Sequence, residues 1–124
     1  MIILLNAADR DFERVKSALE ADPGPWILPA PILSEIGYLI EARFPPRTMD
    51  DFLADIEVGH FLVDCCDGDM ARIRELVGRY ADMALGLADA AVIACAERNG
   101  GRVLTVDYRD FSAVAREGAI TIVP

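Results

Sequence analysis

The chain has 124 residues, of which 53% are hydrophobic and 27% are charged, a composition typical of one globular domain with a sizeable core. Its formal net charge of −9 at pH 7 argues against a general electrostatic attraction to nucleic acid, although acids gathered in one pocket still bind cations. No apolar run approaches the ~18 residues of a membrane span, and the N-terminus lacks the features of a signal peptide. We expect a cytoplasmic protein with one domain over residues 1–124.

The cysteines and the histidine carry no recognisable motif. Cys65, Cys66 and Cys95 are odd in number and have neither zinc-ligand spacing nor a nearby histidine pair. We expect them to be small apolar fillers in a protein from a reducing compartment. The single histidine, His60, precedes a predicted strand, and we assign it no functional role.

Proline and glycine divide the chain into short segments with alternating strand and helix character. The sequence Asp22-Pro-Gly-Pro stops the first predicted helix, and Asn99-Gly100-Gly101 stops a later one. In chain order, the expected elements are an apolar run over Met1–Leu5, a helix from Asp9 or Asp11 to Ala21, a strand over Trp26–Leu28, a helix over Pro31–Arg43, a helix over Thr48–Val58, a strand over Phe61–Asp64, a helix from Asp67 or Asp69 to Tyr80, a helix over Met83–Glu97, a strand over Val103–Val106, a short helix over Asp110–Ala115 and a strand over Ile120–Val123.

Two of these helices have an apolar stripe that predicts which side chains face the core. Thr48 is a plausible N-cap for its helix. In the helix over Thr48–Val58, the inward positions are expected to be Phe52, Leu53 and Ile56. In the helix that ends at Tyr80, they are expected to be Met70, Ile73, Leu76 and Val77. Strands separated by helices favour a mostly parallel sheet with helices on both faces. The predicted fold class is therefore α/β, a three-layer α/β/α sandwich.

One carboxylate lies on an apolar face of the Met83–Glu97 helix. At about 100° per residue, Asp89 shares its face with Val92, Ile93 and Ala96. An ionised carboxylate among apolar neighbours is costly unless a partner compensates its charge. A favourable interaction with the helix N-terminus is the simpler explanation, worth about 0.3–1 kcal/mol, but it does not require this face.

Two other acids also occupy unusual positions. Glu35 shares a face with Ile32 and Leu39 and is expected to point inward, whereas Glu41 falls on the opposite, polar face of the same helix. Asp107 follows the strand Val103–Val106 at its carboxyl end, where open α/β sheets bind their ligands. A helix cap or a turn explains Asp107 equally well.

These three carboxylates would repel one another if they met. At an effective dielectric near 20, two unit charges about 4 Å apart cost roughly 4 kcal/mol, which is large against a typical stability of ~5–15 kcal/mol. A divalent cation removes this cost, and a set of oxygen ligands favours Mg²⁺ or Mn²⁺ over zinc. An acidic Mg²⁺ site in turn indicates phosphoryl transfer with metal-activated water.

Three segments together resemble the PIN-domain family, most closely the VapC-type toxins of type II toxin–antitoxin pairs. They are Leu33-Ser-Glu-Ile-Gly-Tyr-Leu, Arg79-Tyr-Ala-Asp-Met-Ala-Leu-Gly-Leu-Ala-Asp-Ala and Val103-Leu-Thr-Val-Asp-Tyr-Arg-Asp-Phe. The resemblance covers nearly the whole chain. It implies a Mg²⁺-dependent ribonuclease that acts on RNA, forms a homodimer and is inhibited by a cognate antitoxin protein.

The resemblance also implies roles for individual residues. Glu35, Asp89 and Asp107 match the metal-binding and catalytic acids of the family, while Asp82 and Thr105 are possible supporting residues that we expect to be structural. The family also opens with a strand carrying Asp-x-Ser/Thr, and its aspartate is a principal metal ligand. Here the chain reads Met1-Ile-Ile-Leu-Leu-Asn, and by spacing this aspartate would lie a few residues before Met1, so the first strand is expected to be truncated. Either the start codon was assigned too late, or the protein lacks part of its site and of its central strand.

Two alternatives follow from this departure and from the chemistry of the acids. One is a catalytically impaired PIN module that binds antitoxin without cleaving RNA. The other is an unrelated α/β domain with an acidic pocket, such as a phosphorylatable receiver. The second lacks a suitable lysine, because the single lysine, Lys16, lies in the first predicted helix.

Overall fold

The fold is built on a parallel sheet, as the sequence predicts. The structure is a computed structural model that describes residues 2–4, 17, 21, 24–83, 85–105, 115 and 121–123. Within these residues, five strands lie in the order β3-β2-β1-β4-β5, and every neighbouring pair is parallel. The strands are β1 (Ile2–Leu4), β2 (Trp26–Pro29), β3 (Phe61–Asp64), β4 (Arg102–Thr105) and β5 (Thr121–Val123). The α/β class with a parallel sheet is thus confirmed.

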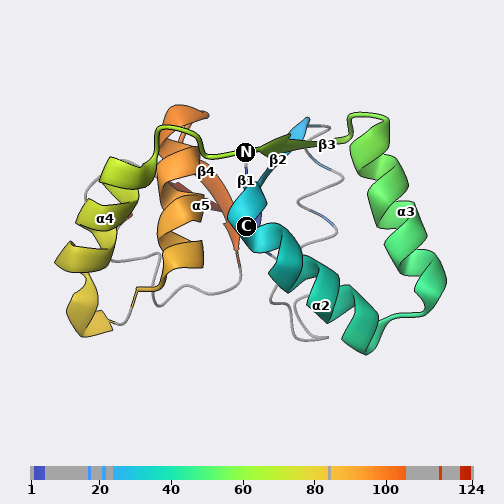
Figure 1. Ribbon diagram of the computed structural model, residues 1–124. Helices are drawn as coiled ribbons and strands as arrows, with labels where there is room; N and C mark the ends of the chain where they lie inside the picture. The colour runs from blue at the N-terminus through green and yellow to red at the C-terminus, as the bar shows by residue number, and fades with distance from the viewer. Residues whose placement is uncertain are drawn as a thin grey trace.

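Helices connect β2 to β3 and β3 to β4, as the parallel pairing of neighbouring strands requires. Figure 1 shows α2 and α3 on one side of the view and α4 and α5 on the other. The elements are η2 (Ala30–Ile32), α2 (Leu33–Arg43), α3 (Pro46–Glu57), α4 (Met70–Arg79), η3 (Ala81–Met83) and α5 (Leu87–Arg98). No helix within the described part of the chain is long and apolar enough to cross a membrane.

Helix α5 is the buried centre of the fold. All seven residues from Ala90 to Ala96 are buried, so this helix is apolar on every side, as a helix surrounded by other elements must be. It ends at Arg98, and Gly100 and Gly101 both have positive φ angles of 94° and 78°, which glycine adopts without steric cost. The predicted stop at this position is confirmed.

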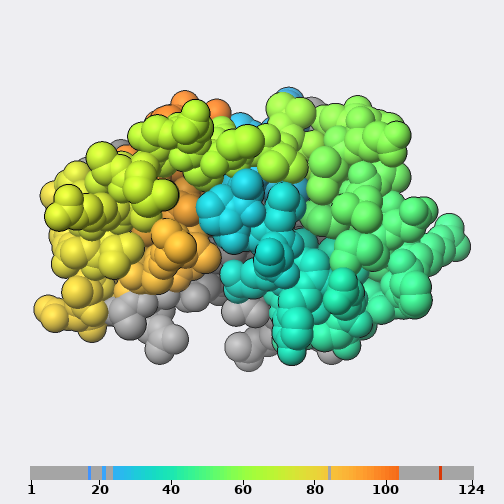
Figure 2. All heavy atoms as spheres, viewed as in Figure 1, coloured from blue at the N-terminus to red at the C-terminus, as the bar shows by residue number. Residues whose placement is uncertain are grey.

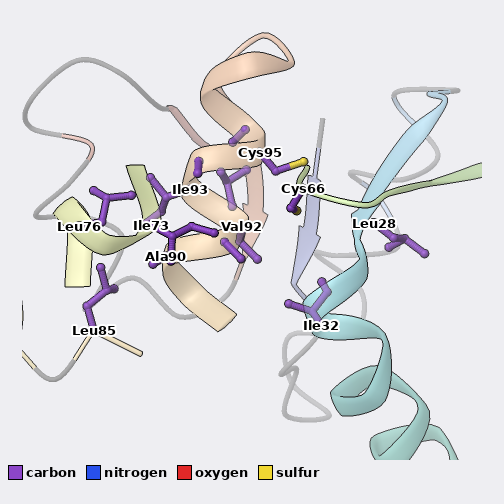
Figure 3. Packing of buried hydrophobic residues seen from close by; sticks show 14 of the residues in the cluster. Leu28, Ile32, Cys66, Ile73, Leu76, Leu85, Ala90, Val92, Ile93 and Cys95 are labelled. Atoms are coloured by element: carbon purple, nitrogen blue, oxygen red, sulfur yellow. The ribbon is translucent and has the colours of Figure 1, made fainter. Parts of the chain in front are cut away.

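The core forms where α5 meets α4 and the start of α2. Figure 3 shows Ile73 and Leu76 of α4 packed beside α5, with Leu28 and Ile32 on its other side. An ion pair also joins α4 and α5, because Arg72 in α4 donates a hydrogen bond to Glu97 in α5 at 2.8 Å. These contacts fix α5 on both sides.

Several local predictions are wrong. Helix α3 begins at Pro46 with Pro45 as its N-cap, not at Thr48, because Pro is well suited to the first helical turn. In the space-filling view, α3 forms one flank of the molecule beside α2 (Figure 2). Among the described residues, α3 packs on the other elements along one side, so Phe52 and Ile56 contact the core whereas Leu53 is 54% exposed.

Helix α4 and the segment before α5 also differ from their predictions. In α4, Ile73 and Leu76 are buried as expected, but Met70 is 65% exposed and Val77 is also exposed, because α4 is a peripheral helix that contacts α5 along a narrow stripe. The predicted helix Met83–Glu97 starts later than expected, because Met83 is the last residue of a short 3₁₀ turn, η3, and α5 starts at Leu87. Most of the predicted helices before residue 22 and after residue 109 lies outside the described residues.

Candidate acidic site and a neighbouring thiol cluster

Asp89 lies in the first turn of α5 and is half-buried. The residues that follow it are completely buried: Val92, Ile93 and Ala96 have no exposed surface. The predicted apolar surroundings of this face are therefore present. Its position at a helix N-terminus is also electrostatically favourable for a carboxylate.

Glu35 lies in the first turn of α2, but the prediction that it points inward is wrong. Its side chain is exposed, like that of Glu41. The buried face of this region consists of Ile32 and Ile36, four residues apart, with Ile40 packed against the core. Glu35 directly precedes Ile36 and so falls outside this stripe. An exposed carboxylate is still able to bind a cation.

The first turns of α2 and α5 both lie near the carboxyl ends of strands in the sheet. Helix α2 follows the carboxyl end of β2 through the η2 turn, and α5 contacts η2. Because α5 is joined to the start of β4 by a short turn, its first residues lie toward the carboxyl end of that strand. Glu35 and Asp89 thus both occupy helix starts near the edge where α/β sheets bind ligands.

The other candidate residues are less fully described. Asp82 lies in η3 and is exposed. Thr105 is the last residue of β4, where its backbone pairs with Leu4. Asp107 lies outside the described residues. His60 is exposed, with Nδ1 at 3.2 Å from Oδ1 of Asp55, which is a local surface interaction.

A second polar group, which the sequence analysis missed, surrounds Arg98 at the C-terminal end of α5. The Arg98 guanidinium donates to Oδ1 of Asp64 at 2.9 Å and to both oxygens of Asp69 at 2.6 Å. Asp69 is buried, at 5% exposure, so its charge requires this partner. The bonds tie the loop between β3 and α4 to α5. Asp64 ends a strand, the same signal that selected Asp107.

Two thiols lie next to this ion-pair network. The Sγ atoms of Cys66 and Cys95 and a carboxylate oxygen of Asp64 all lie within 4.8 Å of one another. Figure 3 shows the Cys95 sulfur extending from α5 toward the loop that carries Cys66. The prediction that the cysteines are small interior fillers agrees with these two, which are buried, but not with Cys65, which is exposed.

Burial and charge together set the protonation of this cluster. The Arg98 guanidinium, as a hydrogen-bond donor, holds the pKa of Asp64 below its ordinary value. Burial raises the pKa of the Cys66 thiol. Burial also raises the pKa of Cys95 to about 12, with the Asp64 charge as a further cause. Both buried thiols are therefore protonated at neutral pH.

Alkylation should distinguish the three thiols of the folded protein. With Cys95 at a pKa of about 12, only about one molecule in ten thousand carries its reactive thiolate at pH 8. We expect iodoacetamide, in the presence of a chelator, to modify the exposed Cys65 and to spare Cys66 and Cys95. Peptide mass spectrometry measures the modification, and all three should react in denaturant. Equal rates at Cys65 and Cys95 in the folded protein would contradict the observed burial.

Comparison with known proteins agrees with this geometry. The sequence matches the PIN domain family over residues 1–117, which is most of the chain. It is also 26% identical over 128 residues to Ribonuclease VapC26 of Mycobacterium tuberculosis (strain ATCC 25618 / H37Rv), an alignment that covers 100% of this chain and 95% of that protein. The chain therefore belongs to the PIN-domain family, and its predicted resemblance to VapC-type proteins is confirmed.

Proposed function

We propose that this protein is a Mg²⁺-dependent endoribonuclease toxin of a toxin–antitoxin pair. The match to the PIN domain family over residues 1–117 carries this proposal. The likeness to a protein named Ribonuclease VapC26 supports RNA as the substrate. The reaction is the hydrolysis of RNA phosphodiester bonds by water. In this proposal the chain forms a single domain over residues 1–124.

The chemistry of the candidate residues fits a hard divalent cation. Glu35 and Asp89 offer carboxylate oxygens and come from the first turns of two helices that begin near one edge of the sheet. Oxygen ligands of this kind suit Mg²⁺, with Mn²⁺ as a substitute. Asp107 follows β4 in the sequence and would supply a third carboxylate.

Each acid has a defined role in this proposal. Asp89, which is half-buried whereas Glu35 and Asp82 are exposed, would hold the cation and limit its position, because α5 itself is fixed in the core. Glu35 would bind from the exposed side, where the RNA phosphate enters. Asp82 and Thr105 would support the site from its edge. When bound, the cation supplies activation of water and stabilisation of the departing oxygen.

Partners and cellular location are part of the same proposal. VapC-type toxins are paired with an antitoxin protein, and we propose that one inhibits this chain by binding at its acidic groove. We also propose a homodimer and a cytoplasmic location. The exposed apolar side chains of α2 and α3, which include Tyr38, Phe44 and Leu53, are compatible with a protein partner.

One observation favours a second candidate function. The described central strand β1 consists of Ile2, Ile3 and Leu4 and carries no carboxylate. A site that receives no carboxylate from this strand should bind Mg²⁺ more weakly. The alternative is therefore a catalytically impaired module that binds antitoxin and leaves RNA intact.

Cleavage of a pool of labelled RNAs tests both candidates. We expect cleavage with Mg²⁺, loss of cleavage with a chelator, and recovery when Mg²⁺ is restored. Glu35→Gln should reduce cleavage by at least about tenfold, whereas Glu41→Gln, a neutralised acid on the same helix, should leave it unchanged.

Two other outcomes have defined meanings. Cleavage that persists in both variants and in the chelator would contradict the proposal and indicate a contaminating nuclease. Absence of cleavage together with tight binding to the cognate antitoxin would support the impaired module instead.

A further inference from the structure

The cluster of Asp64, Cys66 and Cys95 has the composition of a site for a thiol-binding metal. Its three candidate ligand atoms lie within 4.8 Å of one another. Zinc binds thiolate sulfur at about 2.3 Å and carboxylate oxygen at about 2.0–2.2 Å, with tetrahedral angles. Ligands around such an ion are then separated by about 3.5–4 Å. Small rotations of these side chains would bring the three ligand atoms from the observed spacing to the spacing that one bound ion requires.

The surrounding residues hold two of these ligands in place. The backbone N–H of Cys66 donates to Oδ1 of Asp64 at 2.8 Å, and Arg98 binds the same carboxylate. The Asn99 side-chain amide donates to the backbone oxygen of Cys95 at 2.8 Å and lies 3.6 Å from its Sγ atom. Hydrogen bonds of this kind, from outside the ligand set, are what orients the ligands of protein metal sites.

The charge of the cluster also suits a divalent ion. A divalent ion that binds two thiolates displaces two protons, so the net charge of the group is unchanged. The buried region therefore gains no net charge on binding, which avoids the main cost of placing an ion inside a protein.

The ligand types select the class of metal. Two thiolates and one carboxylate favour zinc and similar borderline ions, while Mg²⁺ takes oxygen ligands. The cluster is also separate from the proposed acidic site, because Cys95 follows Asp89 by six residues, about 9 Å along the helix axis. Three protein ligands leave one position for water or another donor.

We propose that Asp64, Cys66 and Cys95 form a zinc-type metal site that joins the β3–α4 loop to α5. This goes beyond the proposed ribonuclease function and does not depend on it. The bound ion would link the end of strand β3 to the C-terminal half of the central helix. Its expected effect is structural, since binding to the folded state alone stabilises that state.

Cobalt(II) is a suitable probe, because it replaces zinc and reports thiolate ligands through its absorption spectrum. We expect the full-length reduced protein to bind one Co²⁺ per chain with a sulfur-to-cobalt charge-transfer band. Equimolar Zn²⁺ should remove this band, and a large excess of Mg²⁺ should not. RNA cleavage is not a readout, so loss of the proposed activity leaves this test unaffected.

Variants identify the ligands. Cys95→Ala should abolish the charge-transfer band, whereas Cys65→Ser, at the exposed neighbouring thiol, should leave it intact. Asp64→Asn keeps both thiols and the size of the side chain, and should weaken Co²⁺ binding by about tenfold or more. This variant still tests the site if Cys95→Ala fails to fold. Zn²⁺ should raise the unfolding temperature of the wild type and of Cys65→Ser, and not that of Cys95→Ala or Asp64→Asn.

Three results would overturn the proposal. The first is the absence of a charge-transfer band in the reduced wild type. The second is a band that persists in Cys95→Ala or disappears in Cys65→Ser. The third is a Cys66–Cys95 disulfide that forms on exposure to a small-molecule disulfide while the reduced protein binds no Co²⁺, which would make the pair a redox couple.

Discussion

Asp89→Asn should reduce Mg²⁺-dependent RNA cleavage by at least about 100-fold. Removing a residue that only hydrogen-bonds to a metal ligand already costs up to about 100-fold, and loss of the ligand itself should cost at least as much. Asparagine keeps the size of the side chain but lacks its charge, so the Mg²⁺ site proposed above would lose an anionic ligand while α5 keeps its shape. Cleavage of labelled RNA under single-turnover conditions measures the effect. Asp67→Asn, at an exposed acid in the β3–α4 loop, is the matched control and should cleave normally.

Thermal unfolding of the same variant separates a metal ligand from a helix-stabilising charge. If Asp89 binds Mg²⁺, the ion should raise the unfolding temperature of the wild type and not that of Asp89→Asn, because only a ligand that binds the folded state stabilises it. If Asp89 only stabilises the helix N-terminus, the variant should lose about 0.3–1 kcal/mol regardless of Mg²⁺. Full cleavage by Asp89→Asn would remove it from the proposed site.

The fold was predictable because its signals are strong and local. Alternating strand and helix segments gave the parallel sheet, and the glycine pair after Asn99 marked the end of the central helix, as observed. The sequence pattern did not predict, to within one residue, which side chains of α2 face the core. The 3₁₀ turn over Ala30–Ile32 precedes α2, and the buried stripe runs through Ile32 and Ile36, so Glu35 lies beside it and is exposed.

The group around Arg98 could not be predicted from spacing alone. Asp64 and Asp69 flank Cys66 in the sequence, but Cys95 and Arg98 lie about thirty residues further on. Only the packing of α5 against the β3–α4 loop brings them together. A search for short ligand motifs therefore misses the cluster, whereas the position of Asp64 at the end of a strand was an available signal.

Ile93→Ala should lower the free energy of unfolding by about 3–4 kcal/mol. Ile93 has no exposed surface, and Ala90 and Ala96, three residues away on the same side of α5, are equally buried. These alanines have no side-chain rotamers with which to fill the space that Ile93 would leave. The cavity should therefore persist, and its cost adds to the lost burial of the side chain.

A loss of this size is large against the ~5–15 kcal/mol stability of a typical domain. It should lower the unfolding temperature by about 10–15 °C, with the denaturation midpoint in urea lowered in proportion. Leu87→Ala is the control, because Leu87 is in the same helix but is 61% exposed, and it should change stability by less than about 0.5 kcal/mol. Equal losses in the two variants would show that α5 is not the buried centre of the fold.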